Sequence, residues 1–245
     1  MKFATIRELT AALPGMAHQI KMAILSHARA SEGTCPSCGY IGRFHGFGTP
    51  VRSGVRCPSC GSLERHRLFS LAVQRNTVSF EGRDVLHFAP EFAVRQSLHA
   101  DGPRSYTTSS YPDDSADLCL DIHATGLPDN SYDVVIASHV LEHVDDARAL
   151  SEIARILRPG GQLIAMVPLI EGWSQSYEDP DIVSEAGRDL HFGQNDHIRY
   201  YGADFRDRLQ GAGFAVSEFT ADGKDSVRFR LYRGEKIFIG TLPEE

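Results

Sequence analysis

Four of the five cysteines in the chain lie in two identical tetrapeptides, Cys35-Pro-Ser-Cys38 and Cys57-Pro-Ser-Cys60. A glycine follows each tetrapeptide, so each can form a tight turn that points both sulfurs at one ion. This spacing is typical of a zinc ribbon, and we expect Cys35, Cys38, Cys57 and Cys60 to bind Zn²⁺. Because four thiolates leave no open coordination position, the expected zinc is structural. A pair of redox-active dithiols is the alternative interpretation.

Charge is distributed unevenly along the 245 residues, whose net charge is -7. Residues 1–80 carry 10 Lys and Arg against 3 Asp and Glu, whereas residues 81–245 carry 15 against 29. This asymmetry predicts two units, 1–80 with an N-terminal helix and the zinc ribbon, and 81–245 as the main domain. An acidic main domain disfavours broad contact with nucleic acid, which leaves RNA as the less favoured partner. The sequence does not indicate an oligomeric state.

Apolar segments long enough to cross a membrane are absent, because no stretch approaches about 18 consecutive apolar residues. The amino terminus, MKFATIRELTAALPGM, lacks the apolar block of a secretory signal. We therefore expect a cytoplasmic protein with no membrane contact.

Strand-like and helix-like segments alternate from residue 84 onward, which is typical of an α/β fold with a parallel sheet covered on both faces. Residues 145–161 have apolar side chains at helical spacing, with aspartates at the start and Pro-Gly-Gly at the end. Residues 203–213 also read as a helix. The predicted strands are 84–89, 104–110, 116–121 (with Cys119 packed in the core), 132–140, 162–168, 214–220 and 235–241.

The segment LPDNSYDVVIASHVLEHVDDARALSEIARILRPGGQLIAMVP resembles the central block of class I S-adenosylmethionine-dependent methyltransferases, the type-11 group. The paired CPSCG knuckles, LHFAPE and FGQNDHIRYYG are similar to a bacterial branch of that group with an N-terminal zinc ribbon. The resemblance implies a Rossmann-like, mostly parallel sheet of seven strands, whose last pair includes one antiparallel strand. It also implies S-adenosylmethionine as the cofactor.

The first cofactor turn implied by the resemblance is VLHFAPE, at the carboxyl end of a strand, where such ligands lie. His87 stands where the family usually carries an acid, and Ala89 and Glu91 stand at glycine positions on either side of Pro90. Glycine allows close approach of the backbone to a ligand, but a cofactor without pyrophosphate needs it less. We expect Glu91 to attract the methionine ammonium group or to bind the ribose.

Three further strand ends complete the implied cofactor site. Ser109 occupies the position of the family's ribose-binding acid, which predicts weaker ribose binding through a neutral hydroxyl. Asp121 and Ile122 match the acidic-apolar pair that binds the adenine amino group and packs on the ring, with a simple helix cap as the alternative for Asp121. Ser138 and His139 end the next strand, where the methionine end and the reactive methyl are expected.

The spacing His139-x-x-Glu142-His143 also resembles the inverted zinc-protease motif and the metal site of certain O-methyltransferases. The segment SHVLEH is frequent in methyltransferases without a second metal, so we favour cofactor contact over a catalytic metal here. Its position at a strand end, outside a helix, argues against a protease.

The resemblance implies an acceptor site between the fifth and sixth predicted strands, in the polar and aromatic segment 171–202. His197 is the first candidate for a general base and His139 the second, because histidine titrates near neutral pH. The candidate acceptor-binding residues are Tyr177, His191, Asp196, Arg199 and Tyr200. The alternative is an ordered lid whose polar groups satisfy one another.

The function indicated by these features is methyl transfer from S-adenosylmethionine to a small polar metabolite or sugar-like acceptor. One alternative is an RNA methyltransferase that holds its substrate with the basic zinc ribbon. A non-catalytic scaffold is the other alternative, since the first cofactor turn lacks glycine and the ribose acid is missing.

Overall fold

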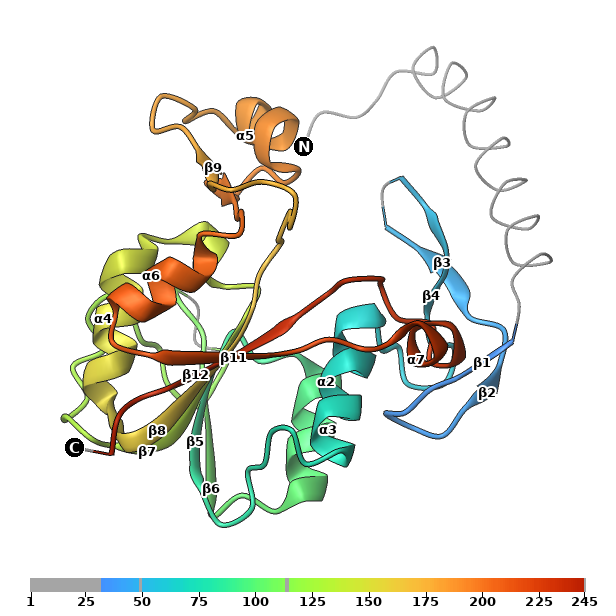
Figure 1. Ribbon diagram of the computed structural model, residues 1–245, viewed down its shortest axis with the longest axis horizontal. Coiled ribbons are helices and arrows are strands. Elements are labelled where there is room, and N and C mark those ends of the chain that lie inside the picture. Colours follow the sequence, from blue (N-terminus) through green and yellow to red (C-terminus); the bar gives the residue numbers. More distant parts are fainter. Residues whose placement is uncertain (1–31, 49, 113–114, 245) are drawn as a thin grey trace. The chain divides into compact units, whose positions relative to one another are not determined.

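The computed structural model describes residues 32–48, 50–112 and 115–244 (Figure 1). The helix expected at the N-terminus lies outside the described residues. The chain forms two compact units, Met1–Leu71 with Ala221–Arg233, and Ala72–Thr220 with Gly234–Glu245. Among the described helices, none combines the length and apolar character that a membrane crossing requires.

The first unit consists of two short hairpins, the beginning of one helix and a segment from near the C-terminus. β1 (Gly33–Thr34) pairs antiparallel with β2 (Ile41–Gly42), and β3 (His45–Phe47) pairs antiparallel with β4 (Arg52–Arg56). The remaining elements are α2 (Glu64–Gln74), which continues into the second unit, and α7 (Gly223–Arg228). The small core contains Cys35, Phe44 and Cys57, so the cysteine turns themselves form much of it.

A buried arginine links the parts of this first unit. The guanidinium of Arg67 is fully buried and lies over the ring of Phe44, with its central carbon 4.7 Å from the ring centroid. It donates hydrogen bonds to the carbonyl oxygens of Phe229 (2.9 Å), Val55 (2.8 Å) and Ser62 (2.8 Å). The buried guanidinium of Arg67 therefore joins the segment 221–233 to the second hairpin, because it donates to carbonyl oxygens of both. Hydrogen bonds from a charged donor are stronger than those between neutral groups.

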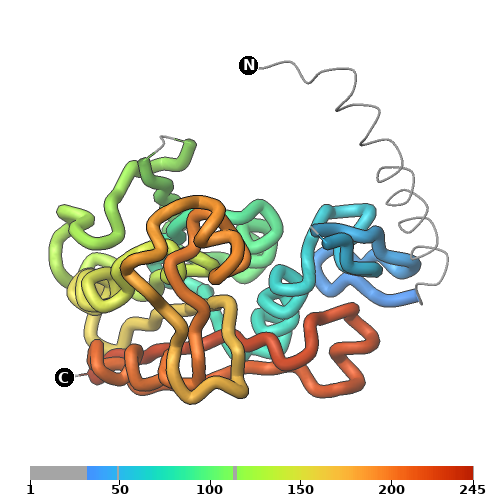
Figure 2. Tube along the Cα trace, turned by 90° about the horizontal axis from the view of Figure 1, so that it is seen from above, coloured from blue at the N-terminus to red at the C-terminus, as the bar shows by residue number. Residues whose placement is uncertain are grey.

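The second unit is built on a six-stranded sheet in the order β11-β12-β8-β7-β5-β6 (Figures 1 and 2). The parallel strands are β5 (Asp84–Phe88), β6 (Ser105–Ser109), β7 (Tyr132–Ser138) and β8 (Leu157–Met166). β12 (Ile237–Thr241) runs antiparallel to both β8 and β11 (Ala215–Phe219). The Rossmann-like sheet and its single antiparallel strand are therefore confirmed.

The predicted count of seven strands is wrong by one, because residues 116–121 make only an isolated parallel bridge between Ser109 and Leu118. The carboxylate of Asp117 accepts hydrogen bonds from the backbone nitrogen (2.9 Å) and the hydroxyl (2.7 Å) of Thr108. The Asp117 carboxylate thus accepts the backbone N–H of Thr108, which is then not available for hydrogen bonds between β6 and a seventh strand. Cys119 in the same segment is exposed, so its expected place in the core is also wrong.

Helix α4 (Asp146–Ile156) confirms the helix predicted near residues 145–161, and Asp145 caps it by accepting from the backbone nitrogen of Arg148 at 3.2 Å. Its buried face includes Leu150 and Ile153. The helix ends earlier than predicted because β8 already begins at Leu157. Figure 1 shows α4 and α6 (Phe205–Gly211) on one face of the sheet and α3 (Phe92–Asp101) on the other.

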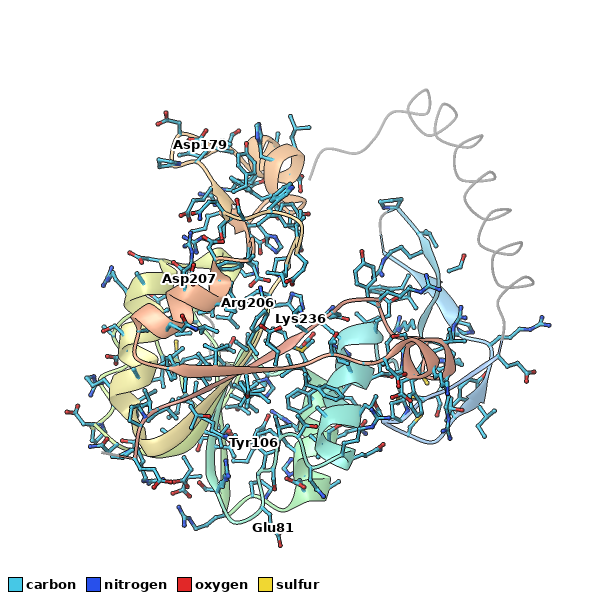
Figure 3. All side chains as sticks on the ribbon, viewed as in Figure 1. Glu81, Tyr106, Asp179, Arg206, Asp207 and Lys236 are labelled. Carbon is cyan, nitrogen blue, oxygen red and sulfur yellow. The ribbon has the colours of Figure 1, made fainter. Side chains whose placement is uncertain are left out.

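Residues 170–202, drawn in orange shades in Figures 1 and 2, connect β8 to α6. They include β9 (Tyr177–Glu178), α5 (Glu185–Phe192) and β10 (Arg199–Tyr200), and β9 pairs antiparallel with β10. An ion-pair cluster lies at the β11 edge of the sheet. In it Arg206 of α6 contacts Glu171 at 2.9 Å, and Lys236, just before β12, contacts Glu218 of β11 at 2.9 Å (Figure 3).

Candidate functional site

A cavity of about 490 Å³ opens at the carboxyl ends of β5, β6 and β7 in the second unit. This is the position at which ligands bind in open α/β sheets, and the volume suits a drug-sized ligand. The cavity is lined by Phe88, Ala89, Ser109, Ser110, Tyr111, Leu120, Asp121, Ile122, His123, His139, Val140, His143, Val144 and Asp196.

Two of the strand ends at the cavity turn through a left-handed backbone conformation. Ala89, directly after β5, has φ 48°, and His139, directly after β7, has φ 54°. The backbone nitrogen of Ala89 donates to the Ser109 carbonyl at 2.8 Å, and that of His139 donates to the Met166 carbonyl at 2.8 Å. A non-glycine residue in this region costs about 1–2 kcal/mol, and such strain is concentrated at functional sites.

Asp121 and Ile122 both line the cavity. One oxygen of the Asp121 carboxylate, Oδ1, accepts from the backbone nitrogen (2.9 Å) and from Nδ1 (2.7 Å) of His123. These hydrogen bonds, chiefly the one from the backbone, lower the pKa of Asp121, so the carboxylate is ionised at neutral pH. Ile122 is buried in the same cluster as Phe88, and the two give the cavity an apolar wall.

Ser109 also lines the cavity, but its hydroxyl oxygen accepts from the backbone nitrogen of Leu120 at 3.3 Å. His87 does not belong to the lining. It is fully buried in β5, its Nδ1 lies 2.9 Å from the hydroxyl of Tyr106, and burial lowers its pKa to about 3. The imidazole of His87 is therefore neutral and supports the strand from inside the protein.

The remaining predicted cofactor residues, Pro90, Glu91 and Ser138, lie outside the lining of the cavity. Glu91 precedes α3 as its N-cap residue, and its Oε2 lies 3.5 Å from the hydroxyl of Ser138, which is buried at the end of β7. The structure thus brings the turn after β5 next to the end of β7.

Beside the cavity, the buried carboxylate of Glu142 lies close to the side chains of three histidines, His139, His143 and His197. Glu142, in the short helix η1 (Leu141–His143), is fully buried, and its Oε1 lies 3.1 Å from Nδ1 of His139. His143 Nδ1 lies 3.3 Å from Oδ2 of Asp196, and its ring is edge-on to that of His197 with 4.7 Å between centroids. His197 is buried, which lowers its pKa and keeps the imidazole neutral.

Among the predicted acceptor residues, only Asp196 lines the cavity. Arg199 is buried, pairs with Glu178 at 2.7 Å and donates to the carbonyl oxygens of Leu141 (3.0 Å) and Val144 (2.6 Å). The guanidinium of Arg199 therefore fixes η1 through these hydrogen bonds, and the Glu178 carboxylate neutralises its charge.

Tyr177, His191 and Tyr200 gather on β9, α5 and β10, outside the cavity lining. The Tyr177 hydroxyl lies 2.6 Å from Nδ1 of His191, and Trp173 packs edge-on against both Tyr177 and Tyr200, with centroids 6.3 and 6.4 Å apart. These contacts give the three side chains partners within the segment itself.

Sequence reasoning did not assign Tyr111, His123 or His143 to the cofactor cavity, although all three line it. For His143 the sequence signal is its place in the spacing His139-x-x-Glu142-His143. Tyr111 and His123 each lie two residues from a predicted site residue, Ser109 and Asp121, and that proximity was the available signal.

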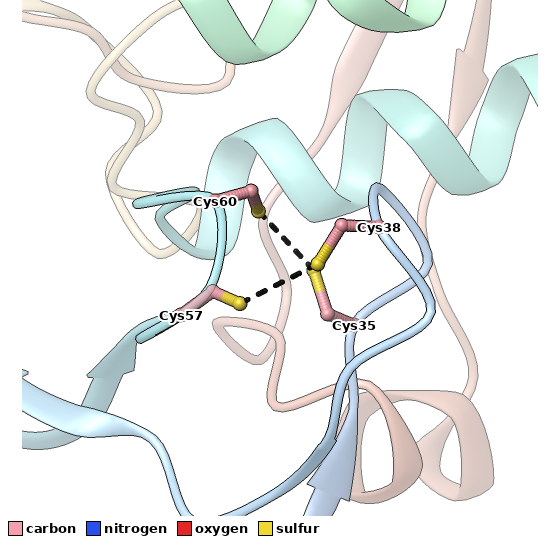
Figure 4. A group of neighbouring side chains, drawn as sticks. All are labelled: Cys35, Cys38, Cys57 and Cys60. Carbon is pink, nitrogen blue, oxygen red and sulfur yellow. Dashed lines mark hydrogen bonds between the residues drawn. The ribbon is translucent and has the colours of Figure 1, made fainter.

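The four predicted cysteine ligands come together in the first unit, with their sulfurs within 4.8 Å of one another. The Sγ atoms of Cys35 and Cys60 are 3.7 Å apart, as are those of Cys38 and Cys57 (Figure 4). Tetrahedral Zn–S bonds of ~2.3 Å would separate the sulfurs by about 3.8 Å, so the donor set fits Zn²⁺.

Comparison with known proteins gives a family match for part of the chain. Residues 88–165 match the model described as a methyltransferase domain. A probable S-adenosylmethionine-dependent methyltransferase of Mycolicibacterium smegmatis is 33% identical over 93 residues, which is 38% of this chain and 32% of the relative. An uncharacterized methyltransferase of Mycobacterium tuberculosis is 54% identical over 37 residues, 15% of each chain. The chain thus spans a third or less of the length of these relatives.

A similar fold occurs in the Burkholderia thailandensis 1,6-didemethyltoxoflavin-N1-methyltransferase, solved with 1,6-didemethyltoxoflavin and S-adenosylhomocysteine bound. The TM-score is 0.51 at 13% identity, covering 73% of this chain and 78% of that chain. At this identity the likeness concerns the fold, which is the Rossmann-like fold of methyltransferases.

Proposed function

We propose that this chain, whose residues 88–165 belong to the methyltransferase-domain family, transfers a methyl group from S-adenosylmethionine to a small polar or sugar-like acceptor. The observation that carries the proposal is the cavity at the ends of β5, β6 and β7, because it combines Asp121 and Ile122 with the left-handed turn at Ala89. S-adenosylhomocysteine binding by the similar Burkholderia fold supports the same choice of cofactor.

In this proposal the adenine binds between Asp121 and the apolar wall of Phe88 and Ile122. Both hydrogen bonds to the Asp121 carboxylate use Oδ1, so Oδ2 is available to accept from the exocyclic amino group. Ser109 and Ser110 offer polar groups to the ribose, and the turn at Ala89 lies at the methionine end. Glu91 and Ser138 support that turn from outside the cavity lining. Bound S-adenosylmethionine supplies an electrophilic methyl group, and its sulfur keeps the bonding pair and leaves as a neutral thioether.

His139 is the base in this proposal. It lines the cavity at the end of β7, and the Glu142 carboxylate accepts from its Nδ1 at 3.1 Å. This hydrogen bond fixes the tautomer with the lone pair on Nε2, which has no hydrogen-bond partner among the described residues. His197 does not line the cavity, so we do not assign the base role to it.

The four-cysteine cluster is proposed to hold a structural Zn²⁺. The hydroxyl of Ser62 lies 3.3 Å from Sγ of Cys35 and 3.2 Å from Sγ of Cys60, and it supports the thiolates. The buried guanidinium of Arg67 partly neutralises the negative charge that four thiolates and one zinc ion leave. The ion would supply folding free energy to a unit with a very small apolar core.

Calorimetry with S-adenosylhomocysteine tests the cofactor site. We expect micromolar or tighter binding by the wild type and at least about tenfold weaker binding by Asp121→Asn, which replaces one accepting oxygen with a donor. Asp117→Asn is the matched control, because its carboxylate supports β6 outside the cavity lining. Absence of binding by the wild type would contradict the proposal and favour a scaffold.

A further inference from the structure

We infer that Glu142, His143 and His197 form a divalent-metal site beside the cofactor cavity, separate from the four cysteines, which binds the hydroxyl group of the acceptor. The inference about the acceptor rests on the proposed methyltransferase function, whereas the metal site itself does not.

Three potential ligand atoms lie close together although they come from two distant segments. One ligand atom from each of Glu142, His143 and His197 lies within 4.8 Å of the others. The two segments are held by the protein alone, because the backbone nitrogen of Ile198 donates to the Glu142 carbonyl at 2.9 Å and Arg199 donates to the carbonyl of Leu141. The site is therefore organised before any ion binds.

The second, independent observation is a buried carboxylate oxygen without a donor. Glu142 is fully buried, its Oε1 is used by His139, and its Oε2 has no hydrogen-bond partner in the parts of the chain that the structure describes. Leaving such an oxygen desolvated and without a donor is unfavourable, because it has lost its hydrogen bonds to water. A cation bound to Oε2 removes this cost.

Both histidines present the tautomer that a metal requires. Nδ1 of His143 faces the Asp196 carboxylate at 3.3 Å, and Nδ1 of His197 faces the carbonyl oxygen of Phe192 at 3.2 Å. Each acceptor favours a hydrogen on Nδ1, so the neutral form of each ring carries its lone pair on Nε2. The Gln194 amide, 2.7 Å from Nε2 of His197, agrees with that lone pair and would turn away when an ion binds.

Two imidazoles and one carboxylate suit Zn²⁺, Mn²⁺, Fe²⁺ or Co²⁺ better than Mg²⁺ or Ca²⁺. Three protein ligands leave coordination positions open. His143 and Asp196 line the cavity, so those positions are accessible to an acceptor bound there. A coordinated hydroxyl group gives up its proton more readily, and His139 lies next to the site to receive it.

The test is a Co²⁺ titration, followed by visible absorption, of protein dialysed until it carries one zinc ion per chain, the ion held by the four cysteines. We expect the wild type to bind one equivalent with weak d–d bands and without the thiolate charge-transfer bands that exchange at the cysteines would give. Glu142→Gln keeps the size of the side chain and its hydrogen bond to His139, and His143→Gln changes a partly exposed residue. Each should weaken binding by more than the ~10–100-fold that loss of a supporting group costs.

His99→Ala is the matched control, because this histidine lies on α3 against Tyr106, and it should bind Co²⁺ like the wild type. Catechol, used as a model hydroxyl ligand, should shift the bands of the wild type. No cobalt binding by the wild type, or equal binding by both cluster variants, would overturn the metal site. Unshifted bands would overturn the assignment of a hydroxyl acceptor.

Calorimetry with S-adenosylhomocysteine on the same samples separates this inference from the proposed function. Retained binding by Glu142→Gln together with lost cobalt binding supports the metal site in a folded protein. If the wild type binds cobalt but not S-adenosylhomocysteine, the metal site stands and the proposed function fails.

Discussion

The ring of His143 lies edge-on to the ring of His197, with 4.7 Å between their centroids, although the two residues come from segments far apart in the sequence. His143 ends the short helix after β7, and His197 precedes β10 in the segment that was expected to bind the acceptor. This contact joins the end of the sheet that bears the cavity to the connection between β8 and α6. The fold thereby places two imidazole rings next to the buried carboxylate of Glu142.

Ala89→Gly should stabilise the protein, because Ala89 has φ 48° and glycine adopts this conformation without strain. We expect a gain of about 0.5–1 kcal/mol in the free energy of unfolding measured with urea, after the larger entropy of glycine in the unfolded chain is subtracted. Ala93→Gly, within α3, is the control and should destabilise by about 1 kcal/mol. Equal destabilisation by both substitutions would show that the turn at Ala89 is not strained.

Burial of His87 should make the protein less stable in acid. Its pKa falls from 6.5 to about 3 on folding, so below pH 6.5 the unfolded state binds a proton that the native state does not. The contribution is fully present above pH 6.5 and is lost progressively as the pH falls toward 3. Between pH 7 and pH 4.5 we expect a loss of about 2–3 kcal/mol in the free energy of unfolding.

His87→Leu should remove this part of the pH dependence, which is measured by urea unfolding at both pH values. His99→Leu, which changes an exposed histidine on α3, should leave the dependence unchanged. The same acid sensitivity in wild type and His87→Leu would contradict the assignment.

Arg67→Lys should weaken the zinc ribbon although it keeps the positive charge. An ammonium group cannot reproduce the planar set of hydrogen bonds that Arg67 makes to the carbonyl oxygens of Phe229, Val55 and Ser62. We expect a loss of about 2–4 kcal/mol and faster transfer of zinc to a chromophoric chelator. Arg43→Lys, at an exposed position, is the control. Unchanged zinc release from Arg67→Lys would limit the role of this arginine to its charge.

The zinc cluster itself should hold one ion per chain after dialysis, measured by mass spectrometry of the metal content. Cys57→Ser replaces a buried ligand and should lose that ion, whereas Cys119→Ser should retain it, because Cys119 is exposed and lies outside the cluster. Loss of zinc from both variants, or from neither, would contradict the assignment of the four ligands.

The sheet and the cavity were largely predictable from local patterns. Apolar strands that alternate with helical segments indicate a parallel sheet, in which the carboxyl ends of the strands meet at one edge. The resemblance to methyltransferases then grouped Ala89, Asp121 and His139, and all three line the cavity. The missing seventh strand was not predictable from apolar content, since it depends on one carboxylate, Asp117, that takes the hydrogen bonds of Thr108.

Side chains in the long connection between β8 and α6 were harder to assign. Arg199 was expected to bind the acceptor, but it pairs with Glu178 and donates to a carbonyl oxygen of η1. Its partners lie at distant positions in the sequence, and no spacing rule identifies them. The same reason explains why His143 and His197 were considered separately, because only the folded chain brings them into contact.

Transfer of labelled methyl groups tests the central claim most directly. Wild-type protein and His139→Ala are incubated with methyl-labelled S-adenosylmethionine and separate pools of small metabolites and RNA, and the products are resolved by size. The account predicts a labelled product of low molecular mass from the wild type and at least about a hundredfold less from His139→Ala. Label confined to RNA, or no labelled product from a wild type that binds S-adenosylhomocysteine, would contradict it.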